Sequence, residues 1–352
     1  MDVMKPDLEW IEGICYRINP GNYGYTAQKS YDHQSHYEQD ESCPIEQFDE
    51  CDIDHEDSIE ELEGGRFKLA FHVAKTYFPY IIGSRAATKK RLESETRTRI
   101  SIPKPGIDGD IIVTGPDKKS VSSAKTRISM MVMSSRKRQA FTHFISIPFN
   151  AQAFQNGFLT FKEEVMNNCK DQGVEESIFQ SPDKLHLTIT TLVLGDDVER
   201  KLAAAALEKC KEDVIRPLLP AEPMKVEMRG IEYMNDDPSA IDVLYGKVTC
   251  PTHPDLLQKL SDGIVDFFVK QGLADREYDR VKLHVTLMNT LFRSPESYET
   301  KKERETFNGS RIMTMYQDFY FGSDFLTRLD LSLRFSSSKA GYYQASASIN
   351  IP

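Results

Sequence analysis

The sequence predicts an α+β protein with two folded domains behind an acidic N-terminal segment. Three observations support this prediction. A block rich in Asp and Glu precedes residue 66, a strand–helix–helix–strand–strand–helix order occupies residues 66–135, and one six-residue pattern occurs twice in residues 140–352. A chain of 352 residues is long enough for two domains with separate hydrophobic cores.

Residues 1–65 are expected to form a largely disordered acidic tail. From Glu38 to Glu63, 13 of the 26 residues are acidic and none is Lys or Arg, so self-repulsion opposes a packed structure. The net charge of −10 becomes +3 when this segment is left out, so the folded part can approach a phosphate backbone. The apolar start around Trp10, the only tryptophan, is either an element packed on its own chain or a docking peptide for a partner.

The composition argues against several classes of protein. The six cysteines are scattered without a Cys-x-x-Cys pair, which argues against a zinc ribbon or a disulfide framework. No stretch approaches the roughly 18 apolar residues needed to span a bilayer, and the first residues lack the features of a signal peptide. We therefore expect an intracellular protein with free thiols and no membrane contact.

The first folded domain is expected at residues 66–135. Residues 67–73 alternate like a strand, and residues 77–82 form a short apolar turn. The remaining predicted elements are a charged helix, two strands and an amphipathic helix at residues 86–95, 98–102, 110–114 and 120–133.

A basic link and a longer α+β domain follow. The link residues Arg136, Lys137 and Arg138 are expected to be solvated between the domains, with a contribution to nuclear import as the weaker alternative. In the domain at residues 140–352, strands are predicted at 141–148, 225–234, 241–248, 315–321, 329–335 and 342–349, and helices at 151–170, 196–218 and 255–271.

Two near copies of one motif lie 98 residues apart in this domain. They are Lys-Leu-His-Leu-Thr-Ile at residues 184–189 and Lys-Leu-His-Val-Thr-Leu at residues 282–287. In a strand, alternate side chains point to opposite faces, so each copy buries its aliphatic residues and presents its histidine and threonine together. This duplication predicts two related lobes, with His186 and Thr188 from one and His284 and Thr286 from the other.

Two imidazoles that face one cleft suit phosphodiester cleavage. Histidine titrates near neutral pH, so one ring can accept a proton from the attacking oxygen while the other donates to the leaving oxygen. Thr188 and Thr286 offer hydroxyl donors to the phosphate oxygens, where charge grows in the transition state. Neither motif has further metal ligands beside it, so we expect no metal and no cofactor. A site that binds a nucleotide without turnover is the alternative.

The paired His-hydrophobic-Thr-hydrophobic motifs resemble the two-histidine phosphoesterase superfamily, which includes RNA ligase/cyclic phosphodiesterase enzymes. This resemblance covers residues 140–352 and implies a bilobal fold with both histidines in a central cleft. It further implies action on RNA ends, 2′,3′-cyclic phosphates or 2′-5′ linkages. Lys184 and Lys282, which precede the two histidine motifs, could guide a polyanion or be solvated.

Residues 81–86, Ile-Ile-Gly-Ser-Arg-Ala, and the charged helix after them are similar to the KH domain, whose Gly-x-x-Gly loop clamps the backbone of single-stranded nucleic acid. The resemblance implies that Gly83, Ser84 and Arg85 contact RNA, with Lys89 and Lys90 adding charge on the next helix. Ala86 replaces the second glycine; because alanine resists positive φ, a tighter turn and an earlier helix start are expected. A KH fold kept for protein contacts is the alternative.

A KH module ahead of a two-histidine phosphoesterase resembles a family of subunits of a transcription-cointegrator complex. That resemblance implies a nuclear protein that works with a helicase subunit in coactivation and alkylation repair, with the segment around Trp10 as the candidate contact. Three hypotheses follow. The leading one is an RNA-directed phosphodiesterase guided by its KH module. The second is a catalytically silent nucleic-acid-binding adaptor that recruits the helicase, and the third is a scaffold whose main contact is the N-terminal tail.

Overall fold

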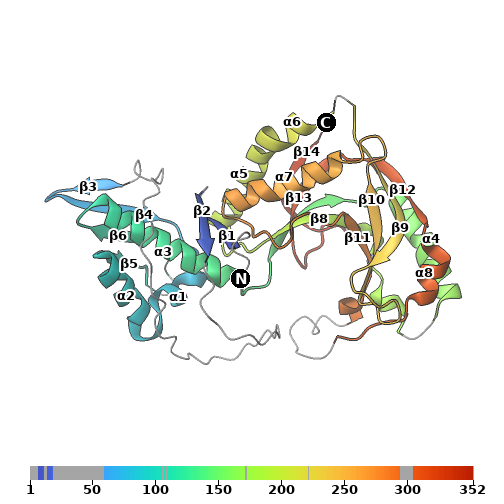
Figure 1. Ribbon diagram of the computed structural model, residues 1–352, viewed down its shortest axis with the longest axis horizontal. Helices are drawn as coiled ribbons and strands as arrows, with labels where there is room; N and C mark the ends of the chain where they lie inside the picture. The colour runs from blue at the N-terminus through green and yellow to red at the C-terminus, as the bar shows by residue number, and fades with distance from the viewer. Residues whose placement is uncertain are drawn as a thin grey trace.

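The structure is a computed structural model that describes residues 7–11, 14–18, 59–104, 107, 109–170, 173–220, 222–293 and 304–351. It contains a small domain, a larger domain and a separate N-terminal hairpin (Figure 1). Within these ranges no helix has the length and apolarity needed to cross a membrane.

The small domain packs three helices against one antiparallel sheet. The strand order is β3-β4-β6-β5. The strands are β3 (Glu60–Leu62), β4 (Arg66–Phe71), β5 (Arg99–Ser101) and β6 (Ile111–Gly115), and the helices are α1 (Phe78–Ile82), α2 (Ala87–Thr96) and α3 (Lys118–Arg136). The predicted element order is present, and β3 extends the sheet to a point before the expected start at residue 66.

Helix α3 closes the small domain because its sequence separates an apolar face from a polar one. Its start is fixed by Asp117, whose Oδ1 accepts a hydrogen bond of 2.7 Å from the Ser120 backbone N–H. Four residues at helical spacing on its apolar face are buried in the small domain's core: Val121, Ala124, Ile128 and Val132.

The large domain is built on one eight-stranded antiparallel sheet in the order β12-β9-β10-β11-β8-β7-β13-β14. Its strands are β7 (His143–Pro148), β8 (His186–Leu192), β9 (Lys225–Tyr233), β10 (Val243–Thr249), β11 (His284–Asn289), β12 (Tyr320–Phe325), β13 (Arg328–Leu333) and β14 (Ala345–Asn350). Its helices are α4 (Gln152–Asn168), α5 (Asp197–Cys210), α6 (Arg216–Leu218), α7 (Leu256–Lys270) and α8 (Ser310–Tyr316). The two strands that begin with the motif histidines, β8 and β11, are the central pair.

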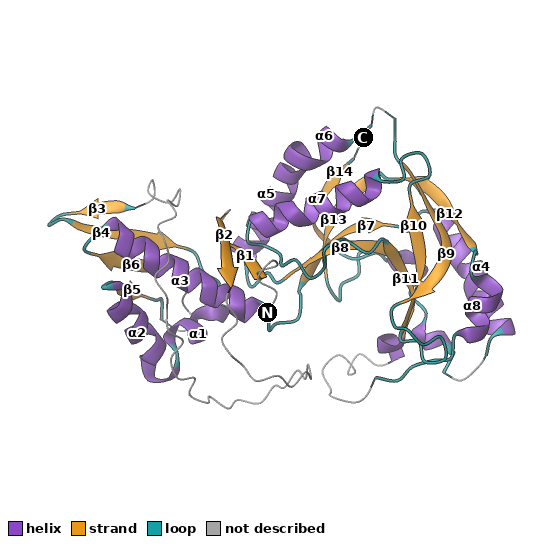
Figure 2. Cartoon of the chain, viewed as in Figure 1, coloured by secondary structure: helices purple, strands orange, loops and turns teal. Residues whose placement is uncertain are grey.

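Two helices of this domain, α4 and α7, cross between the two halves of the sheet. Helix α4 follows β7 in the chain but packs on β12 of the other half, and α7 follows β10 but packs on β8 (Figure 2). The α4–β12 contact is so close that a Cβ added at Gly157 would lie 1.9 Å from the Phe321 carbonyl oxygen. This exchange ties the two lobes into one core.

Two expectations for the large domain need correction. The strand predicted at residues 315–321 is wrong in its first part, because α8 occupies Ser310–Tyr316 and β12 begins only at Tyr320. Ile312 and Tyr316, four residues apart, are both buried on one face of this helix. The single helix predicted at 196–218 is interrupted by a π-helical turn at Lys211–Ile215.

The N-terminal segment contains an antiparallel hairpin of β1 (Asp7–Ile11) and β2 (Ile14–Ile18). The backbone of β1 lies close to α3 of the small domain and to α7 of the large one. The backbone of this segment therefore fits the first alternative, an element packed on its own chain. Docking of the segment to a partner stays a prediction. The acidic block up to residue 58 lies outside the described residues.

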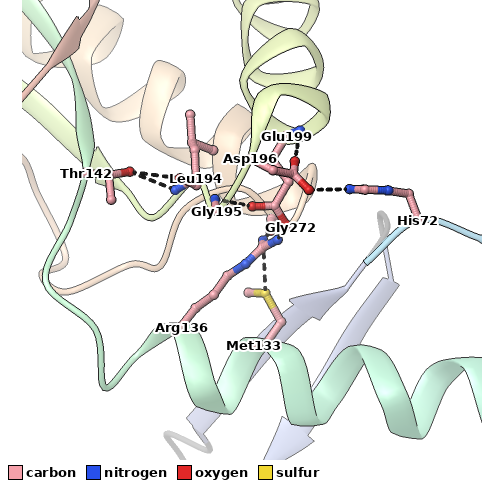
Figure 3. A network of polar contacts seen from close by, with 9 residues as sticks. All are labelled: His72, Met133, Arg136, Thr142, Leu194, Gly195, Asp196, Glu199 and Gly272. Atoms are coloured by element: carbon pink, nitrogen blue, oxygen red, sulfur yellow. Dashed lines mark hydrogen bonds and ion pairs between the residues drawn. The ribbon is translucent and has the colours of Figure 1, made fainter. Parts of the chain in front are cut away.

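A polar network joins the two domains (Figure 3). The Arg136 guanidinium, at the end of α3, forms an ion pair with Glu199 of α5, and the two side chains are only 14% and 6% exposed. His72 Nε2 lies 2.8 Å from Asp196 Oδ2, and Arg136 also donates to the Gly272 carbonyl over 3.3 Å. The expectation of a fully solvated link is thus wrong for Arg136, because its charge is neutralised inside the junction.

Candidate active site and nucleic-acid interface

Strands β8 and β11 bring the two histidine motifs onto one face of the sheet. They pair antiparallel with Val285 opposite Leu187. Continuing this register places His186 opposite Thr286 and His284 opposite Thr188. All four side chains are half-buried, whereas the aliphatic residues between them are buried in the core, as the alternation predicts.

Each histidine is oriented by a backbone carbonyl. His186 Nδ1 lies 2.7 Å from the Lys184 carbonyl oxygen, and His284 Nδ1 lies 2.7 Å from the Lys282 carbonyl oxygen. A carbonyl can only accept, so Nδ1 of each ring must carry the proton and donate. The Nε2 atoms are then left to exchange protons with a substrate.

Burial makes both rings poor holders of a positive charge. Burial, together with the nearby His284, lowers the pKa of His186 to about 4 against the opposing effect of the Lys184 carbonyl. Burial also lowers the pKa of His284, and the Lys282 charge acts in the same direction. His186 is therefore neutral at pH 7 and suited to accept a proton.

In both lobes a tyrosine ring packs against the histidine, and a lysine lies over that tyrosine ring. Tyr343 lies edge-on to His186 with ring centroids 5.2 Å apart, and Tyr245 lies edge-on to His284 at 5.3 Å. The ammonium group of Lys184 sits 5.1 Å from the Tyr343 ring centre, and that of Lys282 sits 4.7 Å from the Tyr245 ring centre.

The two tyrosines were missed in the sequence, because neither is within a motif. Tyr245 is buried and donates a hydrogen bond of 2.7 Å to Glu232 Oε2. Burial and this carboxylate raise the pKa of Tyr245, so the hydroxyl stays protonated. Tyr245 lies in β10, directly opposite Thr286 of β11. This pairing would have marked Tyr245 as a site residue if the strand register had been known from the sequence.

A pocket of about 190 Å³ opens beside His284. Thr188 lines it from the facing strand, and the connection between α7 and β11 forms its outer wall with Tyr278, Arg280 and Lys282. The lining balances its cations with the acidic residues Asp262, Asp275 and Glu277, and Arg280 lies 3.4 Å from Asp262. Within the described residues, no three His, Cys, Asp or Glu side chains gather as metal ligands would.

The loop of the small domain adopts the conformation that its glycine pattern predicts, despite Ala86. Gly83 has φ 70°, and Arg85 and Ala86 both occupy the left-handed region at φ 50° and 61°. Helix α2 begins at Ala87, directly after the loop. Ala86 thus takes the positive φ that it was expected to resist, and a 3-10 turn at Ser84–Ala86 leads directly into α2. Gly83 is required, since a Cβ there would lie 2.2 Å from Thr88 Oγ1.

The loop side chains face solvent. Ser84, Arg85 and Lys90 are exposed, whereas Lys89 is partly covered and lies 3.8 Å from Glu93 in an i,i+4 ion pair. The first turn of α2 has no side-chain cap, so its backbone N–H groups can receive an anion.

The comparisons with known proteins match both domains. The family model described as the AKAP7 2′5′ RNA ligase-like domain matches residues 141–351, and the KH domain model matches residues 68–130. Activating signal cointegrator 1 complex subunit 1 of Mus musculus is 39% identical over 97% of this chain and 98% of its own length.

Two solved structures are similar to one domain each. The first KH type I domain of human vigilin has 22% identity and a TM-score of 0.21, covering 27% of this chain and 94% of its own. The protein TT0787 of Thermus thermophilus has 16% identity and a TM-score of 0.37, covering 59% of this chain and 97% of its own.

Proposed function

Because the chain belongs to the family of activating signal cointegrator 1 complex subunit 1, with a KH domain and an AKAP7 2′5′ RNA ligase-like domain, we propose that it is an RNA-directed phosphodiesterase subunit. The KH domain holds single-stranded RNA, and the two-histidine cleft acts on an RNA phosphodiester or a 2′,3′-cyclic phosphate. By the same kinship, the protein works in a nuclear cointegrator complex with a helicase subunit.

The observation that carries the catalytic part is the matched pair of histidines. His186 and His284 start adjacent strands, each donates Nδ1–H to a carbonyl two residues earlier, and each has a threonine opposite it. Such a preset tautomer leaves two proton-exchanging nitrogens on one face. A protein that only binds RNA has no need of this duplication.

In the proposed mechanism the two rings take different acid–base roles. The neutral His186 Nε2 accepts a proton from the water that attacks phosphorus. The P–O bond to the leaving oxygen breaks as His284, protonated when the anionic substrate binds, donates its Nε2 proton to that oxygen. Thr188 and Thr286 then donate hydrogen bonds to the non-bridging oxygens of the transition state.

The test is turnover of a panel of oligonucleotides with 2′,3′-cyclic phosphate, 2′-5′ and 3′-5′ linkages, with and without EDTA. We expect at least one class to be cleaved at a rate that EDTA does not change. Either His186→Ala or His284→Ala should lower kcat by about 10²-fold or more. Wild-type rates in both variants would refute the assignment.

One observation favours the adaptor as a second candidate. The pKa values of both histidines are lowered, so neither ring is charged at pH 7 before a ligand binds. A cleft that binds a nucleotide phosphate without completing the proton transfer would have the same geometry. Binding of the panel without any turnover, together with unchanged helicase recruitment by the histidine variants, would identify this function.

A further inference from the structure

The pocket beside His284 is small, and its charges balance. Its volume of about 190 Å³ is below the roughly 300–1,000 Å³ of pockets for drug-sized ligands. The lining carries three acidic side chains, Asp262, Asp275 and Glu277, and three basic ones, Arg276, Arg280 and Lys282. A lining of one sign would attract an anion, whereas a balanced pocket of this size suits a flat, uncharged group.

The basic side chains of the outer wall are engaged by their own neighbours. Arg280 Nε lies 3.4 Å from Asp262 Oδ2, and the Arg276 guanidinium forms an ion pair with Asp266. The Lys282 ammonium lies over an aromatic ring of β10, 4.7 Å from the ring centre. Each cation of the wall is thus held in place, which leaves the hydroxyl, aromatic and aliphatic groups of the lining to meet a ligand.

An aromatic ring stands at the rim of this pocket. Tyr278 lines the pocket and is 76% exposed, more than any other large hydrophobic side chain that the structure describes. A ring in this position contributes nothing to the core. Its large apolar area is therefore available to a ligand that enters the pocket.

The loop that carries Tyr278 is fixed on both sides of it. Arg276 Nη1 donates to the Asp279 carbonyl over 2.9 Å, which closes a turn around the tyrosine. The Val281 backbone N–H donates to Asp262 Oδ1 of α7 over 2.8 Å. The ring is thus presented to solvent from an anchored backbone, as a stacking surface requires.

The facing wall of the pocket is a row of hydroxyl groups on β8. Thr190 and Thr191 line it beyond Thr188, which lies beside the reacting phosphate in the proposed mechanism. Two to three residues of strand separate these hydroxyls from Thr188 by roughly 7–10 Å, which leaves room for a ribose between phosphate and base. Proteins stack the bases of single-stranded RNA on aromatic rings and hydrogen-bond their edges, and a hydroxyl can both donate and accept.

We propose that this pocket is a nucleobase subsite, in which Tyr278 stacks on one base of the RNA, Thr190 and Thr191 contact the edge of that base, and the adjoining phosphate lies at His284. The inference rests on the proposed function and specifies its substrate. Because His284 donates its proton to the leaving oxygen in that mechanism, the bound base belongs to the nucleoside that leaves. The substrate class is therefore a phosphodiester whose leaving group carries a base.

The test is a double-mutant cycle between the ring and the base. The ligands are dinucleotides with a phosphorothioate linkage, which resists hydrolysis, either complete or with each base removed in turn. Tyr278→Ala should weaken binding of the complete dinucleotide about 5- to 150-fold, the range for losing one base stack. Removing one of the two bases should cause the same loss in the wild type and no further loss in Tyr278→Ala. Tyr278→Trp should keep the affinity.

Affinity is measured by isothermal titration calorimetry on the full chain with Arg85→Glu, which weakens the KH contribution. The matched control is Phe325→Ala, which removes another exposed aromatic ring at the end of β12, outside this pocket, and should leave the affinity unchanged. The unfolding midpoint of Tyr278→Ala should equal that of the wild type, because an exposed ring contributes little to stability.

Wild-type affinity in Tyr278→Ala would overturn the proposal and leave the exposed ring to a protein partner. A loss that persists with both base-deleted dinucleotides, or an equal loss in Phe325→Ala, would overturn it as well. Failure of the proposed function is seen separately, in the turnover of the oligonucleotide panel. A selective cycle at Tyr278 without any turnover supports the subsite and refutes the catalysis, whereas turnover without the cycle does the reverse.

Discussion

Replacing Ala86 by glycine should stabilise the protein, which is unusual for an alanine-to-glycine change. A left-handed non-glycine residue costs about 1–2 kcal/mol, and Ala86 has φ 61°. Glycine removes this cost but loses about 0.5–1 kcal/mol more backbone entropy on folding. The expected gain is therefore about 0.5–1 kcal/mol, or about 2–8 °C in the melting temperature if the small domain unfolds alone.

The neighbouring residue supplies the matched control. Ala87 has φ −64° and is the first residue of α2, so Ala87→Gly makes the same change in the unfolded chain without relieving strain. It should destabilise by about 0.5–1 kcal/mol. Thermal unfolding followed by circular dichroism should place the two variants on opposite sides of the wild type. If Ala86→Gly melts as low as Ala87→Gly, the left-handed assignment is refuted.

Three further predictions concern other parts of the chain. The pKa of His186 is about 4 in the folded protein against an ordinary 6.5, so between these values the unfolded chain binds more protons and the protein loses stability as the pH is lowered. His186→Gln should therefore reduce the stability lost between pH 7 and pH 5 by about 2 kcal/mol, and calorimetry that finds equal losses in variant and wild type would contradict this. Arg85→Glu should weaken RNA binding and flatten its salt dependence by about one unit of log–log slope, measured by anisotropy titrations; unchanged affinity and slope would favour a protein-contact role. Deleting residues 1–30 should abolish helicase binding in a pull-down, and Trp10→Ala alone should cost about 2 kcal/mol or more, whereas intact binding with a lowered melting temperature would make the segment structural.

The histidine strands could be predicted because their signal is local. Leu187 and Val285 each alternate with polar neighbours, and this alternation shows which face of the strand each side chain takes. Because the motif occurs twice, the two strands could also be predicted to form matching parts of one site. The element order of the small domain was visible for the same reason, since strand and helix periodicities are contained in short windows.

The rest depends on contacts between residues far apart in the chain. The ring of Tyr343 reaches His186 across the sheet, and no local pattern marks it as a partner. The helix at Ser310–Tyr316 has a short apolar run that fits strand or helix equally, and only its burial distinguishes the two. Ala86 shows the converse, because local sterics disfavour the conformation that the folded domain imposes.

The junction has a practical consequence for dissecting this protein. A break in the chain after residue 138 would separate Arg136 from Glu199, whose side chain is 6% exposed. In either isolated half the junction opens to water, so the buried ion pair is lost from both sides. The isolated large domain would expose Glu199 on α5, and the isolated small domain would expose the aromatic ring of Tyr77 beside Arg136. Stability measured on either isolated half is therefore that of a weakened domain, and the two values together underestimate the stability of the intact chain.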